Sequence, residues 1–457
     1  MQKVFLNPET LKDYDWITNI YTMKNYLILF LLFAVTDTAT AQTNTASSFM
    51  VNDIKVIYKP TSKDIIHVSL YFRGGVGNYP AEKAGIEKLA VTGAIDCGNK
   101  RYSTNEFKDK SDQFGIEMSA SSHLDDSRIS MNCISKYFNE GWDLFSTSIL
   151  NPAYNEDAFE KVKQNSYASM NQLQGNPDSR LKSLAVQNAF SGTPYATNPD
   201  GTDSSLAGLS RNEVNEYYYK TLLNKTRLFI VVVGNISKEE VAARITASFK
   251  DIPAFEYKTP SFETPGFTKT TIDIEQRSIA TNYILGIVNA PSYTSPDYTP
   301  YLLSFSELSG MLFAELRMNK GLSYAPGAHV YPLLMPYADV HVSTTSPKEA
   351  VTAIVKAIQT EENSSIARKS LAQIKALYIT RNYMKDESTD AIAESLGSSE
   401  ILGNWMIAEQ FPVLLKNTTR SEMSAAFKKY VTGIKWTYLG DKTKADESIS
   451  SFYNDFK

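Results

Sequence analysis

The sequence predicts an α+β fold made of two similar units, each an antiparallel-rich sheet with helices packed on one side. Strand-like runs come in groups and are followed by groups of helical patterns, an order typical of α+β proteins and unlike the strict alternation of α/β proteins. The order of elements then repeats after a segment at 251–269 that holds three prolines and little periodicity. Order and spacing, rather than identity, therefore indicate duplication of one unit.

The first unit is predicted at residues 42–250. Residues rich in β-branched and aromatic types, or alternating with period two, predict strands at 53–60, 65–72, 116–121, 128–134 and 227–235. Helical patterns occur at 84–97, 104–114, 136–150, 155–189 and 207–223, with a further helix after Ser237. Ser103 and Glu106 have the spacing of a capping box, in which each side chain satisfies a backbone N–H at the start of the helix.

The second unit is predicted at residues 270–457. It begins with a strand-rich region at 270–289, and a helix is expected from about residue 297 after a turn with two prolines. A hairpin within 322–345 and further helices follow, one of them opened by Ser346-Pro347. A capping box from Thr419 to Glu422 and a late strand at 434–441 complete the repeat.

The overall composition excludes some classes of partner. The chain has 457 residues, of which 42% are hydrophobic and 21% charged, and this balance is typical of a folded protein. A net charge of -4 and a pI near 5.8 provide no basic field for nucleic acid. We therefore expect no nucleic-acid partner.

The first 41 residues are predicted to contain a segment upstream of the true start codon, followed by a secretory signal. The apolar run YLILFLLFAV, Tyr26–Val35, is only about half the ~20 residues that a membrane-spanning helix needs. Lys24 precedes it and Ala39-Thr40-Ala41 follows, as in a signal peptide with its cleavage site. We expect translation to start at Met23 and the mature chain to begin near Gln42, exported to the periplasm or cell envelope without a stable membrane span. The alternative is a buried or membrane-anchoring helix.

Two cysteines, Cys97 and Cys133, remain after the predicted cleavage. Two residues are too few for a disulfide framework, so we interpret them as small core residues, and a single bridge between them remains the alternative.

Three stretches resemble the insulinase and pitrilysin family of metallopeptidases, also called the mitochondrial processing peptidase family. They are HVSLYFRGGVGNYPAEKAGIEKLA, YYYKTLLNKTRLFIVVVGNISKEEV and LFAELRMNKGLSYAPGAHV, in the family's order and spacing. The resemblance covers the chain from about residue 50 to its end and implies two similar domains that form half of a clam-shell.

The family's zinc motif is absent from this chain. Active members carry H-x-x-E-H on the helix after the first turn, where two histidines bind Zn²⁺ and the glutamate activates the metal-bound water. Counted from Gly85, these positions hold Lys88, Val91 and Thr92, none of which can do that work. The family's third ligand should lie near 168–170, and no glutamate occurs between Glu160 and Glu213. No two histidines lie four residues apart, and we therefore expect no zinc in this chain.

A second motif of the family is present. In the family, an arginine and a tyrosine seven residues apart reach over the metal site from the opposite domain and hold substrate backbone, and the tyrosine helps to stabilise the oxyanion. Arg317 and Tyr324 have this spacing, and guanidinium and phenol groups are donors suited to a carbonyl or developing oxyanion. The alternative is that Arg317 is a solvated helix residue and Tyr324 packs on a strand.

These observations predict a non-catalytic, substrate-holding subunit of an exported two-subunit zinc peptidase. A paralogous partner with H-x-x-E-H would bind zinc, and this chain would supply Arg317 and Tyr324 to the partner's site for peptide substrates while remaining inactive alone. One alternative is a non-proteolytic structural or peptide-binding homologue, like the core subunits of the respiratory bc1 complex. Another is an active metallopeptidase with non-standard ligands. The sequence leaves open the cleavage preference, the partner's identity and whether the chain forms homodimers or heterodimers.

Overall fold

The computed structural model describes residues 45–362 and 368–453, without the side chains of residues 368–370. The predicted signal segment at residues 1–41 lies outside the described residues. In the described part of the chain the strands form two sheets, one with six strands and one with five. No helix in this part is long and apolar enough to cross a membrane.

The first sheet has the strand order β1-β2-β6-β3-β5-β4. Its strands are β1 (Ser47–Val51), β2 (Ile54–Pro60), β3 (Ile65–Arg73), β4 (Glu117–Ser122), β5 (Asp126–Ile134) and β6 (Leu228–Gly234). Every pair is antiparallel except β2 with β6. β6 is buried along its whole length, as its unbroken apolar sequence predicts. The predicted strands are thus confirmed, and β1 is an additional strand that pairs with β2.

Helices of the first half pack on this sheet and bury its main apolar face. They are α2 (Ile86–Asp96), α3 (Thr104–Phe114), α4 (Phe138–Leu150), α5 (Glu156–Gly175), α6 (Pro177–Ala189), α7 (Asp203–Gly208), α8 (Arg211–Tyr217), the π-helical turn η5 (Tyr218–Leu222) and α9 (Lys238–Phe249). The helix predicted at 155–189 is two helices, because Pro177 lacks a backbone N–H and starts a new helix capped by the Asn176 side chain. The capping box from Ser103 to Glu106 is present as predicted.

The second sheet repeats the topology of the first. Its strands are β7 (Thr271–Gln276), β8 (Asn282–Asn289), β9 (Gly327–Tyr331), β10 (Tyr337–Thr344) and β11 (Lys435–Gly440), in the order β7-β11-β8-β10-β9. In the first sheet β6 lies between β2 and β3, parallel to β2 and antiparallel to β3. In the second sheet β11 lies in the same way between β7 and β8, parallel to β7 and antiparallel to β8. The duplicated α+β architecture predicted from the order of elements is confirmed.

The helices of the second half cover one face of this sheet and also extend beyond it. They are α10 (Tyr298–Leu312), the π-helical η6 (Phe313–Asn319), α11 (Pro347–Glu362), α12 (Arg368–Lys385), α13 (Thr389–Ile401), α14 (Met406–Asn417), α15 (Arg420–Tyr430) and α16 (Lys442–Phe452). The segment 251–269, predicted as a linker, contains neither helix nor strand.

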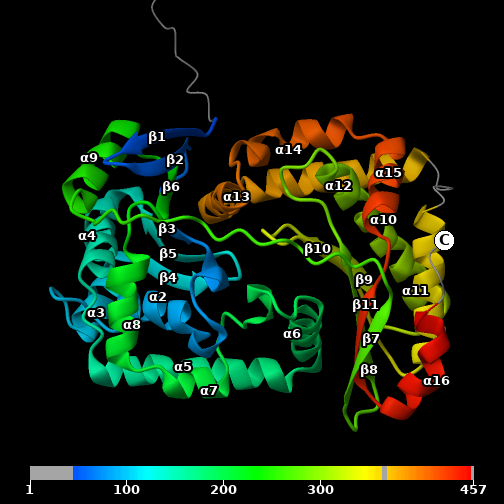
Figure 1. The fold of residues 1–457 in the computed structure, drawn as a ribbon. Coiled ribbons are helices and arrows are strands. Elements are labelled where there is room, and N and C mark those ends of the chain that lie inside the picture. The colour runs from blue at the N-terminus through cyan, green and yellow to red at the C-terminus, as the bar shows by residue number, and fades with distance from the viewer. Residues whose placement is uncertain (1–44, 363–367, 454–457) are drawn as a thin grey trace, which may run out of the picture. The chain divides into compact units, whose positions relative to one another are not determined.

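Each sheet also receives a helix from the other half of the chain. α13 packs on β3 and β6 of the first sheet, where Ile392 and Leu396 join a buried cluster with Tyr71 and Phe229 (Figure 1). In return, α6 packs on β8 and β11 of the second sheet. Helices were predicted on one face of each sheet, and this exchange places a further helix on the other face. Hydrophobic periodicity within one half could not predict it.

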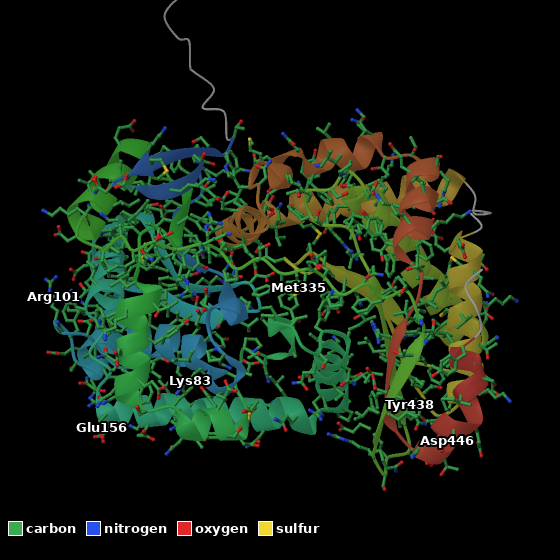
Figure 2. The ribbon with its side chains drawn as sticks, in the orientation of Figure 1. Lys83, Arg101, Glu156, Met335, Tyr438 and Asp446 are labelled. Carbon is green, nitrogen blue, oxygen red and sulfur yellow. The ribbon has the colours of Figure 1, made fainter. Side chains whose placement is uncertain are left out.

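The hairpin of β9 and β10 makes a further contact with the first half. The Asp125 carboxylate accepts hydrogen bonds from the Tyr195 hydroxyl and from the backbone N–H of Leu334, whose N–Oδ2 distance is 2.9 Å. Met335, in the turn between the two strands, is fully buried and donates its N–H to the Tyr195 hydroxyl at 3.1 Å (Figure 2).

Cys97 and Cys133 are free, buried residues of the first core, as the sequence interpretation held.

Candidate functional site

Helix α2 is positioned by a glycine turn. Gly85 caps the helix with φ 88°, a backbone conformation that residues with a Cβ rarely adopt. A Cβ at this position would also come within 3.0 Å of the Leu206 side chain and 3.1 Å of the Gly201 backbone. Gly85 is therefore required by the turn that starts α2.

The three motif positions on α2 do not fit a zinc ion. The Lys88 ammonium forms an ion pair with Asp200, with 2.5 Å between Nζ and Oδ1. Val91 is fully buried in the core, and Thr92 is half-buried. The third ligand was expected near residues 168–170 on α5, where no glutamate occurs and Met170 is buried. These groups supply no set of neutral imidazole or carboxylate ligands, so the motif positions of this helix do not form a zinc site.

The only charged residue that α2 places in the interior is Glu87, next to Lys88. Its carboxylate pairs with the Arg227 guanidinium, and neither side chain has any solvent exposure. Tyr217 donates its hydroxyl to Glu87 Oε1 at 2.8 Å, and Ser127 donates to Oε2 at 2.7 Å. The sequence does contain this early glutamate, but nothing local to it reveals a partner 140 positions away.

Arg227 is equally well satisfied. Its Nε donates to the carbonyl of Arg73 at 2.8 Å, and its guanidinium carbon lies 5.5 Å from the centre of the Tyr257 ring. Burial by itself would lower the pKa of this group, but the Glu87 carboxylate more than offsets that effect and the pKa of Arg227 is raised. The interior beneath α2 thus holds a closed, structural ion pair.

Arg317 and Tyr324 lie in contact with each other. Arg317 belongs to η6, where the helix widens into a π-helical turn, a form often found at functional sites. The chain then turns at Gly321, and the backbone N–H groups of Leu322 and Ser323 both donate to the carbonyl of Leu316. This turn places the Arg317 guanidinium 4.2 Å from the centre of the Tyr324 ring, within the range of a cation–π interaction.

The contact forms part of an exposed surface. The guanidinium also lies 5.0 Å from the Phe313 ring, which is itself exposed, as is Met318. Tyr324 is 77% exposed, so the alternative in which it packs on a strand is wrong. Among the described residues, no carboxylate pairs with Arg317 and no group hydrogen-bonds to the Tyr324 hydroxyl. Their donors therefore remain available to a ligand.

The two motifs are not joined within this chain. In the part of the chain that the structure describes, no hydrogen bond, ion pair or ring contact links Arg317 or Tyr324 to Lys88, Val91 or Thr92.

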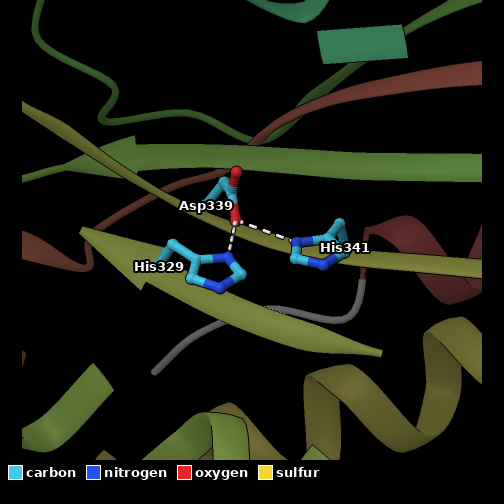
Figure 3. A group of neighbouring side chains, drawn as sticks. All are labelled: His329, Asp339 and His341. Carbon is cyan, nitrogen blue, oxygen red and sulfur yellow. Dashed lines mark hydrogen bonds and ion pairs between the residues drawn. The ribbon is translucent and has the colours of Figure 1, made fainter. Parts of the chain in front are cut away.

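A third group was missed by the sequence interpretation. His329, on β9, and Asp339 and His341, on β10, form the one group among the described residues whose ligand atoms could hold a metal ion (Figure 3). A search for histidines four residues apart on a helix cannot find it, because its spacing follows the register of a hairpin. The signal that could have revealed it is Asp-Val-His, in which alternate residues of a predicted strand share one face.

Comparisons with known proteins agree with this picture. Residues 208–378 match the family model described as "Peptidase M16 inactive domain". The Helicobacter pylori protein named "Non-peptidase homolog YmxG" is 23% identical over 311 residues, which cover 66% of this chain and 71% of that protein. The chain is therefore similar to inactive-type homologues of the M16 peptidases. The resemblance to this insulinase-like family, predicted from the sequence, is confirmed.

Further similar proteins agree with this comparison. The Bacillus subtilis protein named "Probable inactive metalloprotease YmfF" is 23% identical over 318 residues, covering 64% of this chain and 70% of that protein. A solved protease from Helicobacter pylori has a TM-score of 0.79 at 16% identity, covering 87% of this chain and 99% of that one. An M16 inactive domain from Pseudomonas fluorescens has a TM-score of 0.78, also at 16% identity, covering 87% and 98%. At such identities the structural matches establish the fold alone.

Proposed function

We propose that this M16 homologue is the non-catalytic, substrate-holding subunit of an exported two-subunit zinc peptidase. A paralogous partner would contribute an H-x-x-E-H helix and its zinc ion, and this chain would contribute Arg317 and Tyr324 to the partner's site. The observation that carries the proposal is the exposed contact between these two side chains, in a chain whose own α2 has no zinc ligands.

The chemistry of the exposed surface supports this assignment. Arg317 lies against two aromatic rings and pairs with no carboxylate among the described residues, so no carboxylate in that part of the chain neutralises its charge. Such a guanidinium can donate to the backbone carbonyls of a peptide. The neighbouring phenol of Tyr324 is a donor of the kind that stabilises an oxyanion when held at a reacting carbonyl.

A non-proteolytic structural or peptide-binding role is the second candidate. Two observations favour it: the closed ion pair of Glu87 and Arg227 beneath α2, and the names of the two curated relatives, which describe a non-peptidase and an inactive metalloprotease. An active peptidase with non-standard ligands has less support, because the candidate metal group among the described residues lies on β9 and β10 rather than at α2.

The deciding experiment is reconstitution. The candidate partner is a paralogous chain with H-x-x-E-H, sought first in a neighbouring gene. We expect each chain alone to be inactive towards an unstructured peptide library, and the mixture to elute as one complex by size-exclusion chromatography and to cleave peptides. An intact complex with no more activity than the partner alone would favour the structural role.

A further inference from the structure

We propose that His329, Asp339 and His341 form a binding site for one divalent metal ion of the zinc class, on the face of the second sheet opposite its main helical layer. The site is distinct from the α2 motif and does not depend on the function proposed above. It replaces the expectation from the sequence that this chain holds no zinc, which rested on the α2 motif alone. The site is built by the register of the β9–β10 hairpin.

The register places all three side chains on one face. Asp339 lies directly opposite His329 across the antiparallel pair, and His341 lies opposite Gly327. Residues two apart on a strand point the same way, and directly opposed residues share a face. The alternate residues of β10, Ala338, Val340 and Val342, point into the core beneath the helices.

The spacing of the ligand atoms suits a single ion. His341 Nδ1 lies 3.1 Å from Asp339 Oδ1, and His329 Nδ1 lies 3.6 Å from the same oxygen. With metal–ligand bonds of about 2.0–2.1 Å, two ligands of a tetrahedral ion lie about 3.3 Å apart. The observed distances fall on either side of that value, and the three ligand atoms all lie within 4.8 Å of one another.

The surroundings orient the ligands. Tyr331 donates its hydroxyl to Asp339 Oδ2 at 2.8 Å, which leaves Oδ1 facing the two imidazoles. The imidazole rings of His329 and His341 stack, with 5.1 Å between their centres and 7° between their planes, so one ring must rotate for both in-plane nitrogen lone pairs to reach a shared ion. A hydrogen bond to the second oxygen of a ligand carboxylate is the kind of outer contact that fixes metal ligands in place.

Gly327 makes room for this arrangement. A Cβ on Gly327 would lie 3.0 Å from Cε1 and 3.1 Å from Nε2 of His341. These contacts are tighter than nearly all real Cβ contacts, so a side chain at this position would require the His341 ring to shift by a few tenths of an ångström.

The site is open on one side. The Asp339 side chain is only 2% exposed, whereas those of His341 and His329 are 21% and 56% exposed. An ion held by the three protein groups would have at least one position left for water, as in three-ligand zinc sites. Two nitrogens and one carboxylate oxygen favour zinc and its late first-row neighbours over calcium or magnesium, which prefer oxygen ligands only.

The test measures metal binding directly. The mature chain is stripped with a chelator, dialysed, and titrated with Zn²⁺ by calorimetry and with Co²⁺ by visible absorption. We expect one equivalent of metal in the wild type and an affinity at least ~100-fold lower in His329→Gln. Losing a residue that only contacts a metal ligand already costs ~10–100-fold in affinity, and losing a ligand should cost at least the upper value. His123→Gln, which alters an exposed histidine outside the group, is the matched control and should bind as the wild type does.

A second variant tests the geometry without removing a ligand. Gly327→Ala should displace the His341 ring by a few tenths of an ångström and lower the affinity by up to ~10-fold. Circular dichroism verifies that each variant is folded. The proposal is overturned if the wild type binds no stoichiometric metal, which would leave an ordinary hydrogen-bonded trio, or if His329→Gln binds metal as tightly as the wild type.

Discussion

The Arg227 guanidinium donates to the Glu87 carboxylate with both side chains wholly excluded from solvent. This ion pair joins α2 to the start of β6, and it lies directly beneath the helix that carries the catalytic residues in active relatives. Because Tyr217, Ser127 and the Arg73 carbonyl hydrogen-bond to the pair, it has the character of a structural element rather than of a site that receives substrate.

Breaking this pair should destabilise the first half strongly. Removing one partner of a buried ion pair leaves an uncompensated charge and typically costs about 3–5 kcal/mol. We expect Arg227→Met and Glu87→Gln each to lower the urea midpoint, and the double variant to be more stable than the sum of the two predicts. Lys220→Met, which breaks the exposed pair with Glu216, is the control and should have little effect. Additive single effects would contradict direct coupling.

The contact between the β9–β10 turn and the first half should depend on pH through Asp125. Burial raises the pKa of Asp125 from 3.8 to about 6, although hydrogen bonds from Tyr195 and the Leu334 N–H oppose this. The folded state therefore holds the proton more tightly than the unfolded state, and the contribution of Asp125 to stability falls as the pH rises from about 4 to about 6. The upper limit of the loss is about 3 kcal/mol.

The measurement compares unfolding free energies of the wild type and Asp125→Asn between pH 4 and pH 7. The variant cannot ionise, so its stability relative to the wild type should increase from pH 4 to pH 6 and then stay constant. Asp446→Asn, at an exposed carboxylate on α16, is the control. A difference that does not change with pH would show that Asp125 titrates normally in the folded chain.

The sequence predicted most elements because their signals are local. The alternation in β4 and β5, the apolar run of β6 and the capping boxes at Ser103 and Thr419 each lie within a few residues. The exchange of α6 and α13 between the halves was not predictable, because a helix face shows that it is buried but not on which sheet. The candidate metal group was missed for a similar reason: His329 meets Asp339 only through hairpin pairing.

The α2 positions should hold no zinc. Lys88 is committed to Asp200, and Thr92 is a poor ligand with no imidazole or carboxylate beside it at the motif positions. Metal analysis after dialysis should therefore give the same content for Thr92→Ala as for the wild type. A zinc ion that is lost from Thr92→Ala but retained in His329→Gln would contradict this, and it would revive the reading of an active peptidase with non-standard ligands.

The signal sequence that we expect before Gln42 would give the exported protein a defined mature terminus. We expect protein isolated from the cell envelope to begin near Gln42, after the Ala39-Thr40-Ala41 sequence. N-terminal sequencing tests this, and replacing Ala41 by a bulky residue such as in Ala41→Phe should block the cleavage. Recovery of a cytoplasmic form that starts at Met1 would contradict both export and the start at Met23.

The last prediction separates a catalytic partner from a structural one. If Tyr324 donates to the oxyanion at the partner's zinc, Tyr324→Phe should leave assembly intact and lower kcat by roughly 10²-fold or more, about 3 kcal/mol. Arg317→Ala should act mainly on KM, because a guanidinium that holds backbone carbonyls does so in both the ground state and the transition state. Since Arg317 also lies against the Tyr324 ring, some loss of kcat from disordering that ring is expected as well.

Tyr383→Phe, at another exposed tyrosine, is the matched control and should leave kcat and KM unchanged. The complex is reconstituted with the H-x-x-E-H partner, and its assembly is verified by size-exclusion chromatography. Unchanged kcat and KM in both variants of an intact, active complex would mean that the pair is structural.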